Sequence, residues 1–144
     1  RAHYEGTGPE IWKATANKVT HFVSSMGTTG TIVGTSQFLK EQNPNIQIIG
    51  VQAEDGAQIP GIRKWPEEYL PEIFTMKNID TIVNVSQNNA ARQLAQKEGI
   101  FSGASTGGAL HVALEIANKN PDAVIVSIAC DRGDRYLSTG IFPA

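Results

Sequence analysis

Cysteine is almost absent from this sequence: the 144 residues include one cysteine, which has no partner for an internal disulfide. Because disulfides belong to oxidising compartments, we expect a reducing, cytoplasmic location. The chain also lacks any apolar run near the roughly 20 residues of a membrane helix, and it opens without a signal-peptide pattern. Only 18% of the residues are charged, and the formal net charge is −2. The sequence therefore predicts neither a nucleic-acid partner nor a membrane partner.

Metal-ligand spacing and a starting methionine are missing too. The histidines, His3, His21 and His111, are not spaced as metal ligands, so no metal site is expected. The chain opens at Arg1 and soon enters a helix pattern, in which Pro9 suits the first helical position. We therefore expect residues 1–144 to be a single domain and a fragment of a longer protein.

Apolar, β-branched runs alternate with helical patterns along most of the chain. Strands are predicted at residues 19–25, 46–53, 81–85 and 123–130, and helices at 9–16, 31–43, 88–99 and 103–120. A strand, a helix and a strand in succession form the βαβ unit of a parallel sheet. The predicted fold class is α/β: a mostly parallel twisted sheet with helices on both faces, in which strands 19–25, 46–53 and 123–130 are neighbours.

Residues 54–77 break this alternation. They contain three prolines and two glycines and show no clear period. A loop of this length within a compact domain is usually functional or disordered, so we expect an irregular segment here.

A glycine- and threonine-rich loop stands between the first predicted strand and its helix, and it consists of Gly27, Thr28, Thr29, Gly30 and Thr31. Backbone N–H groups at a helix N-terminus bind anions, and glycines let a phosphate approach closely. The loop has no lysine after its last glycine, as a Walker loop has, and no second glycine two positions after the first, as the dinucleotide fingerprint has. A phosphate site with neutral donors and a merely steric turn both remain open.

Four motifs resemble one family when taken together: SSMGTTGT, IPGIRKWPEEYLP, EGIFSGASTGG and CDRGDRYLSTG. Their order and spacing resemble the B-type cysteine synthases, fold-type-II pyridoxal-phosphate enzymes also called O-acetylserine sulfhydrylases. The resemblance runs from His3 to Phe142 and covers the C-terminal half of that family. It implies pyridoxal 5'-phosphate as cofactor and a homodimer. It also implies a β-replacement of O-acetyl-L-serine by sulfide or thiosulfate, giving L-cysteine or S-sulfocysteine plus acetate.

The resemblance assigns roles to individual residues. Residues 27–31 match the loop that binds the cofactor phosphate, and Ser105 matches the serine that contacts the pyridine nitrogen. A neutral serine leaves that nitrogen largely unprotonated, which suits elimination and replacement at Cβ. Thr106 stands where a second serine is usual.

Substrate contacts are implied for four further residues: Gly61, Arg63, Lys64 and Cys130. Arg63 matches the family, whereas Lys64 replaces a common second arginine and offers a point charge in place of a planar fork. Cys130 is expected at the C-terminal end of a strand, either as a buried packing residue or as a wall of the active site. The charged residues that follow it, from Asp131 to Arg135, are expected to form a salt-linked turn.

The catalytic lysine is missing from this chain. In the family, the lysine that binds the cofactor covalently lies well upstream of the phosphate loop, so no catalytic residue is assigned here and the fragment is not expected to be active alone. Cystathionine β-synthase, another fold-type-II enzyme or a non-catalytic binding or assembly fragment are the alternatives.

Overall fold

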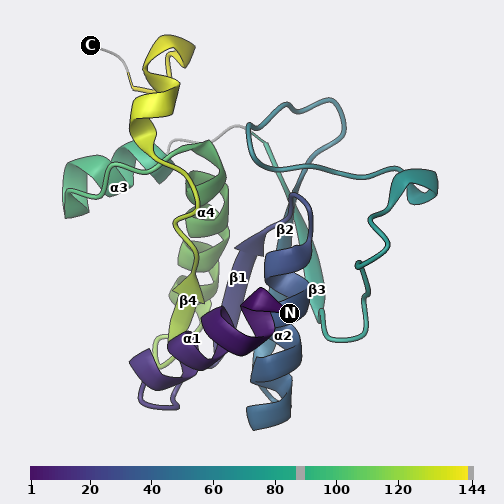
Figure 1. Cartoon of the computed structure of the whole chain (residues 1–144). Coiled ribbons are helices and arrows are strands. Elements are labelled where there is room, and N and C mark those ends of the chain that lie inside the picture. Colours follow the sequence, from purple (N-terminus) through teal and green to yellow (C-terminus); the bar gives the residue numbers. More distant parts are fainter. Residues whose placement is uncertain (87–89, 143–144) are drawn as a thin grey trace.

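Four parallel strands form the centre of the protein, in a computed structural model that describes residues 1–86 and 90–142. The strands are β1 (His21–Ser25), β2 (Gln47–Ala53), β3 (Thr81–Val85) and β4 (Ile125–Ser127), and their order is β3-β2-β1-β4. Every strand pair is parallel, with His21 opposite both Gln47 and Ile125. The predicted α/β class and the predicted neighbours of the first strand are confirmed (Figure 1).

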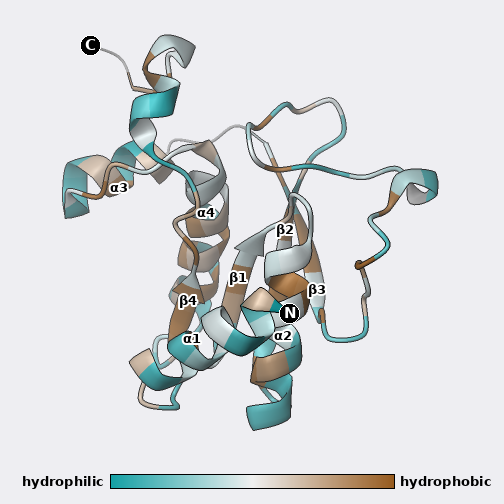
Figure 2. Ribbon diagram, in the orientation of Figure 1, coloured by the Kyte–Doolittle hydropathy of each residue, from teal (hydrophilic) through white to brown (hydrophobic). Residues whose placement is uncertain are grey.

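Helices cover both faces of this sheet. The helices are α1 (Gly8–Ala14), α2 (Gly30–Gln42), α3 (Ala90–Glu98) and α4 (Ala104–Lys119). Successive strand residues point to opposite faces, so Phe22 packs toward α1 and α2 whereas Val23 packs toward α4. Figure 2 shows hydrophobic colours on the strands and hydrophilic ones at the free end of α2.

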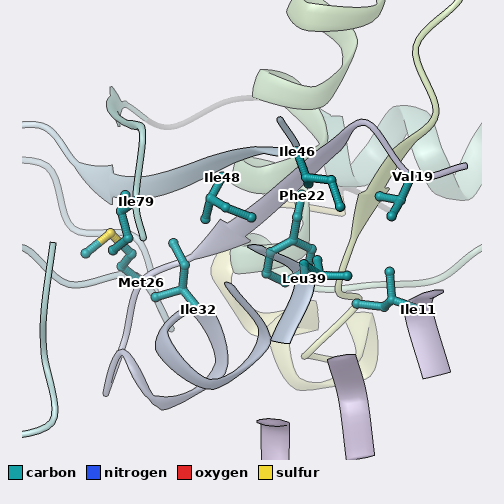
Figure 3. Close-up of a cluster of buried hydrophobic side chains, with 9 residues drawn as sticks. All are labelled: Ile11, Val19, Phe22, Met26, Ile32, Leu39, Ile46, Ile48 and Ile79. Carbon is teal, nitrogen blue, oxygen red and sulfur yellow. The ribbon is translucent and has the colours of Figure 1, made fainter. Parts of the chain in front are cut away.

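The core on the α2 side holds the largest fully buried side chains, including Phe22, Ile32 and Leu39. Figure 3 shows this cluster between the sheet and the helices: Ile11, Val19, Phe22, Met26, Ile32, Leu39, Ile46, Ile48 and Ile79. Burying one such side chain stabilises the fold by about 1.5–3 kcal/mol. This packing fixes α2 on β1 and β2, and with it the loop that connects β1 to α2.

The last strand is much shorter than the sequence predicted. Residues 123–130 were expected to be extended, but β4 spans only Ile125–Ser127, paired with His21–Val23 of β1. Beyond Ser127 the chain turns toward α4, where the Asp131 carbonyl accepts a hydrogen bond from the Gly103 N–H at 3.0 Å. The predicted place of Cys130 at a strand end and its predicted burial were therefore wrong, because Cys130 lies beyond the strand and is exposed. Its other expected role, as a wall of the active site, stays a prediction.

The other predicted helices are found with shifted ends. α3 ends before Gly99, which adopts the left-handed conformation (φ 69°) of a helix terminus; the predicted start at residues 88–89 lies outside the described residues. At the N-terminus a π-helical turn, η1 (His3–Thr7), precedes α1, and the sequence pattern gave no sign of it.

The segment of residues 54–77 is irregular, as predicted, apart from the 3₁₀ turn η2 (Glu67–Tyr69). Its later part exposes the apolar side chains of Tyr69, Leu70, Ile73 and Met76. A second 3₁₀ element, η3 (Gly133–Thr139), forms the tail beside α3 (Figure 1). In the described ranges no helix is both long and apolar enough to cross a membrane.

Candidate functional site

The glycine- and threonine-rich loop leads directly into the N-terminus of α2, the position that the sequence predicted. Gly30 is the first residue of the helix, and Thr29, the N-cap, has a left-handed backbone (φ 68°). Glycine is the residue expected in a left-handed conformation, but here a threonine adopts it. First-turn N–H groups have no acceptor within their own helix, and no side chain of the described residues caps α2.

Thr29 also carries a buried hydroxyl that lacks a hydrogen-bond partner among the described residues. The residue is only 3% exposed. Leaving a buried polar group unpaired costs about 1–3 kcal/mol. The Thr29 hydroxyl is therefore suited to donate a hydrogen bond to an acceptor atom of a bound ligand. The loop carries no charged side chain, and its donors suit a phosphate held by N–H and O–H groups.

Ser105 lies in the first turn of α4 and is 2% exposed. Its Oγ lies 3.1 Å from Cys130 Sγ, and its carbonyl accepts a 2.6 Å hydrogen bond from Ser25 Oγ. Because Ser25 ends β1 just before the loop, this bond ties the start of α4 to the loop that precedes α2. The structure thus brings Ser105 and residues 27–31 to the same edge of the sheet.

Asp131 caps the N-terminus of α4, although it lies far along the chain. Its carboxylate accepts hydrogen bonds from Ser105 N–H at 3.0 Å, from Thr106 N–H at 3.1 Å and from Thr106 Oγ1 at 2.5 Å. A Cβ at Gly103, the N-cap position, would overlap the Asp131 carboxylate and the ring of Tyr136. The absence of a side chain at Gly103 therefore leaves room for the cap that Asp131 provides.

The charge state of this cap is fixed by its contacts. Burial alone would raise the pKa of Asp131, but the hydrogen bonds from Thr106 and Ser105 outweigh it and leave the pKa below its ordinary value of 3.8. Tyr136 donates to Asp131 at 2.9 Å; burial and that hydrogen bond raise the pKa of Tyr136 to about 12. The predicted salt-linked turn was wrong for Asp131, since only Arg132 and Asp134 pair in it, at 3.0 Å.

The irregular segment closes over the loop. The Arg63 N–H donates to the Met26 carbonyl at 2.8 Å, and Trp65 Nε1 donates to the Gly27 carbonyl at 2.6 Å. Gly61 has φ 84°, and a Cβ there would lie 2.9 Å from the Ser105 Cβ. Gly61 is therefore in direct contact with the serine.

The predicted substrate residues fall into two groups. Gly61 and Cys130 both lie against Ser105, at the predicted cofactor site. Arg63 and Lys64 are exposed on the segment: the Arg63 guanidinium lies 5.3 Å from the Trp65 ring centroid, and Lys64 Nζ pairs with Asp55 at 2.7 Å. They form an exposed rim of the segment, in which the Asp55 carboxylate offsets the charge of Lys64.

A separate hollow does not coincide with these residues. It holds about 190 Å³ between α3, the tail and the irregular segment, and its lining includes Ile59, Ala104 and Ile141. No predicted cofactor residue lines it. In the part of the chain that the structure describes, no three His, Cys, Asp or Glu side chains are grouped as metal ligands.

Residues 1–131 match the family described as "Pyridoxal-phosphate dependent enzyme". The chain belongs to the pyridoxal-phosphate-dependent enzymes. Within this family it is 58% identical, over 144 residues, to cysteine synthase B of Escherichia coli strain K12, which confirms the resemblance to the B type. That alignment covers 98% of this chain and 48% of the relative, so the chain spans about half the length of the curated relatives it matches.

Solved structures of family members show the same fold. O-acetyl serine sulfhydrylase isoform 3 of Entamoeba histolytica superposes with a TM-score of 0.86 at 28% identity, covering 98% of this chain and 45% of that one. The O-acetylserine-dependent cystathionine β-synthase of Helicobacter pylori superposes with a TM-score of 0.83 at 35% identity, covering 99% and 50%.

Two contributors to the site were missed by sequence reasoning. Asp131 was assigned to a salt-linked turn, and His3 was given no role although its Nε2 lies 3.3 Å from Thr31 Oγ1. The signal for Asp131 was the position of Gly103: a helix that starts after a residue without a side chain has no side-chain cap from that residue and leaves room for one from elsewhere.

Proposed function

We propose that residues 1–144 form the C-terminal, cofactor-binding domain of a two-domain cysteine synthase. In the complete protein, O-acetyl-L-serine reacts with sulfide or thiosulfate to give L-cysteine or S-sulfocysteine plus acetate. The 58% identity to the cysteine synthase B of Escherichia coli supports this activity. The cysteine of this chain is single and exposed, which fits a cytoplasmic enzyme, and the exposed apolar side chains of the irregular segment fit a homodimer.

The observation that carries the proposal is the unpartnered hydroxyl of Thr29 at an uncapped helix N-terminus. The phosphate of pyridoxal 5'-phosphate fits there: the Gly27–Thr31 backbone and hydroxyls supply neutral donors, and the dipole of α2 favours negative charge. Ser105, tied to the same edge through Ser25, is the proposed partner of the pyridine nitrogen.

Each residue then has a defined task. When bound, pyridoxal phosphate supplies an electron sink for charge that develops at the substrate Cα. Ser105 orients the ring without protonating its nitrogen, since a hydroxyl is a far weaker acid than a carboxyl group. Gly61 and Cys130 wall the site beside it. Arg63 attracts an anionic sulfur donor to the rim, beside Lys64, which is paired with Asp55.

The test is an assay of the full-length protein and of its Gly30→Val variant. The parent should release acetate from O-acetyl-L-serine and form L-cysteine from sulfide. A Cβ at Gly30 meets Ile73 at an ordinary 3.5 Å, so the variant should fold while its extra methyl groups intrude on the phosphate. We expect cofactor retention on dialysis to be lost in the variant, with an unchanged unfolding midpoint of the cofactor-free protein.

The cofactor-retention comparison should use protein whose cofactor-bearing lysine is replaced, because the covalent bond masks weak anchoring. If Gly30→Val binds pyridoxal phosphate as tightly as the parent, residues 27–31 are only a turn, and the proposal loses its basis.

Cystathionine β-synthase activity is the second candidate, because the Helicobacter pylori relative of that name is 35% identical to this chain. Both activities release acetate from O-acetyl-L-serine, so the thiol acceptor separates them. Supplying homocysteine in place of sulfide, and comparing kcat/KM, decides between the two.

A further inference from the structure

We propose that His3 is a positioning residue that orients the Thr31 hydroxyl toward the cofactor phosphate, an inference that rests on the proposed function. His3 lies in the π-helical turn η1, one of the short distortions often found at functional sites. Its two ring nitrogens contact two hydroxyls: Nδ1 lies 3.0 Å from Thr7 Oγ1, and Nε2 lies 3.3 Å from Thr31 Oγ1.

The packing of η1 on α2 holds the ring at this place. A Cβ at Gly34 would lie 2.9 Å from the His3 Cβ and 3.1 Å from the Tyr4 nitrogen, so the missing side chain lets the turn lie against the helix. Gly34 lies three residues after Thr31 on α2, which puts the two on the same side of the helix. His3 thus lies beside the first turn of α2, at the end that faces the phosphate.

The tautomer of His3 decides what Thr31 can do. If Nε2 carries the proton, Thr7 donates to Nδ1, His3 donates to Thr31 Oγ1, and the Thr31 proton is free for a phosphate oxygen. If Nδ1 carries the proton, Thr31 must donate to His3 and its proton is used up. A bound phosphate therefore favours a ring with its proton on Nε2, because with Nε2 unprotonated the Thr31 proton is held by His3 and does not reach a phosphate oxygen.

The experiment measures binding of pyridoxal 5'-phosphate, and of pyridoxal without the phosphate, to the full-length enzyme lacking its cofactor-bearing lysine. Since a net hydrogen bond changes an equilibrium by about 2- to 10-fold, His3→Phe should weaken pyridoxal phosphate binding by that factor and leave pyridoxal unchanged. His3→Gln keeps an N–H donor and should restore most of the affinity. His111→Gln, on the exposed face of α4, is the matched control and should change nothing.

A double-mutant cycle separates positioning from general support. With Thr31→Val in place, His3→Phe should cause no further loss, because the hydroxyl it orients is gone. Fully additive losses, or an equal loss of pyridoxal binding, would overturn the inference. If Thr31→Val weakens binding and His3→Phe does not, only the role of His3 falls. If Gly30→Val and Thr31→Val both bind pyridoxal phosphate as the parent does, the proposed function is wrong, and so is the role of His3.

One readout needs no variant. Nitrogen-15 spectra of histidine in the cofactor-loaded parent report the tautomer directly, and we expect the Nε2–H form for His3. An Nδ1–H form in the loaded enzyme would contradict the proposal even if every variant failed to fold.

Discussion

Helices α2 and α4 begin at the same edge of the sheet, and their N-termini differ in one respect. At α4 a carboxylate of the chain, Asp131, accepts two backbone N–H bonds and a hydroxyl bond. At α2 no side chain of the described residues caps the helix, and Thr29 Oγ1 is buried without a partner. The protein provides its own anion at one helix and none at the other, where first-turn N–H groups remain available. We therefore expect the cap of α4 to act in stability and the N-terminus of α2 to act in anion binding.

The strongest way to test this difference is to remove the unpartnered hydroxyl. Thr29→Val keeps the side-chain shape, so it should stabilise the cofactor-free protein by about 1 kcal/mol, since a buried unpaired group disappears. It should also weaken pyridoxal phosphate binding by roughly 10- to 150-fold, the range for a hydrogen bond to a charged acceptor. Urea unfolding and cofactor titration of the full-length, lysine-free protein measure the two effects.

Thr35→Val is the matched control for that variant. Thr35 is a fully buried threonine of α2 whose hydroxyl also lacks a partner among the described residues. It should stabilise the protein to a similar extent and leave cofactor binding unchanged. Equal binding by both variants would mean that the Thr29 hydroxyl does not contact the phosphate.

Neutralising the Asp131 carboxylate should lower the stability of the fold more than it weakens cofactor binding. Asp131→Asn removes the charge from the N-terminus of α4 and should cost about 1–2 kcal/mol in urea unfolding. Asp134→Asn breaks only an exposed pair with Arg132 and should stay within about 0.5 kcal/mol of the parent. A stable Asp131→Asn protein with weakened cofactor binding would reverse the roles assigned to the two helices.

Lowering the pH tests the same comparison, with a smaller expected effect on stability. The pKa of Asp131 is lowered by folding, so its contribution is complete above the unfolded value of 3.8 and is lost as pH falls through the lower folded pKa. The stability difference between the parent and Asp131→Asn should therefore be constant above roughly pH 5 and shrink below it. A difference that stays constant down to the acid limit of folding would show that the charge is not what stabilises α4.

Local patterns in the sequence predicted most of the fold. Three of the four strands and the helices α2 and α4 lie within about two residues of their predicted ends, because apolar periodicity and glycine or asparagine breaks act over neighbouring residues. The fourth strand was overestimated. Residues 128–130, Ile-Ala-Cys, have strand-like composition, but β1 pairs with β4 only at His21–Val23. Pairing partners decide strand length, and a single strand does not contain that information.

For the candidate site, the sequence predicted the loop and Ser105 through the family motifs, and it missed the residues that support them. Asp131 reaches α4 from a separate part of the chain, and no rule on adjacent residues connects it with Ser105. His3 meets Thr31 because a π-helical turn packs at Gly34. Contacts of this kind depend on tertiary packing, which motif spacing does not encode.

The two hydrogen bonds from the irregular segment also determine the geometry of the loop amides. A trans peptide is planar, with its C=O and the next N–H pointing in opposite directions. Because the Met26 and Gly27 carbonyls point at Arg63 N and Trp65 Nε1, the N–H groups of Gly27 and Thr28 point away from the segment. A movement of the segment would thus rotate two peptide planes and re-aim two donors. A contact made at the rim that Arg63 and Lys64 form can therefore re-aim these two donors without touching the loop itself.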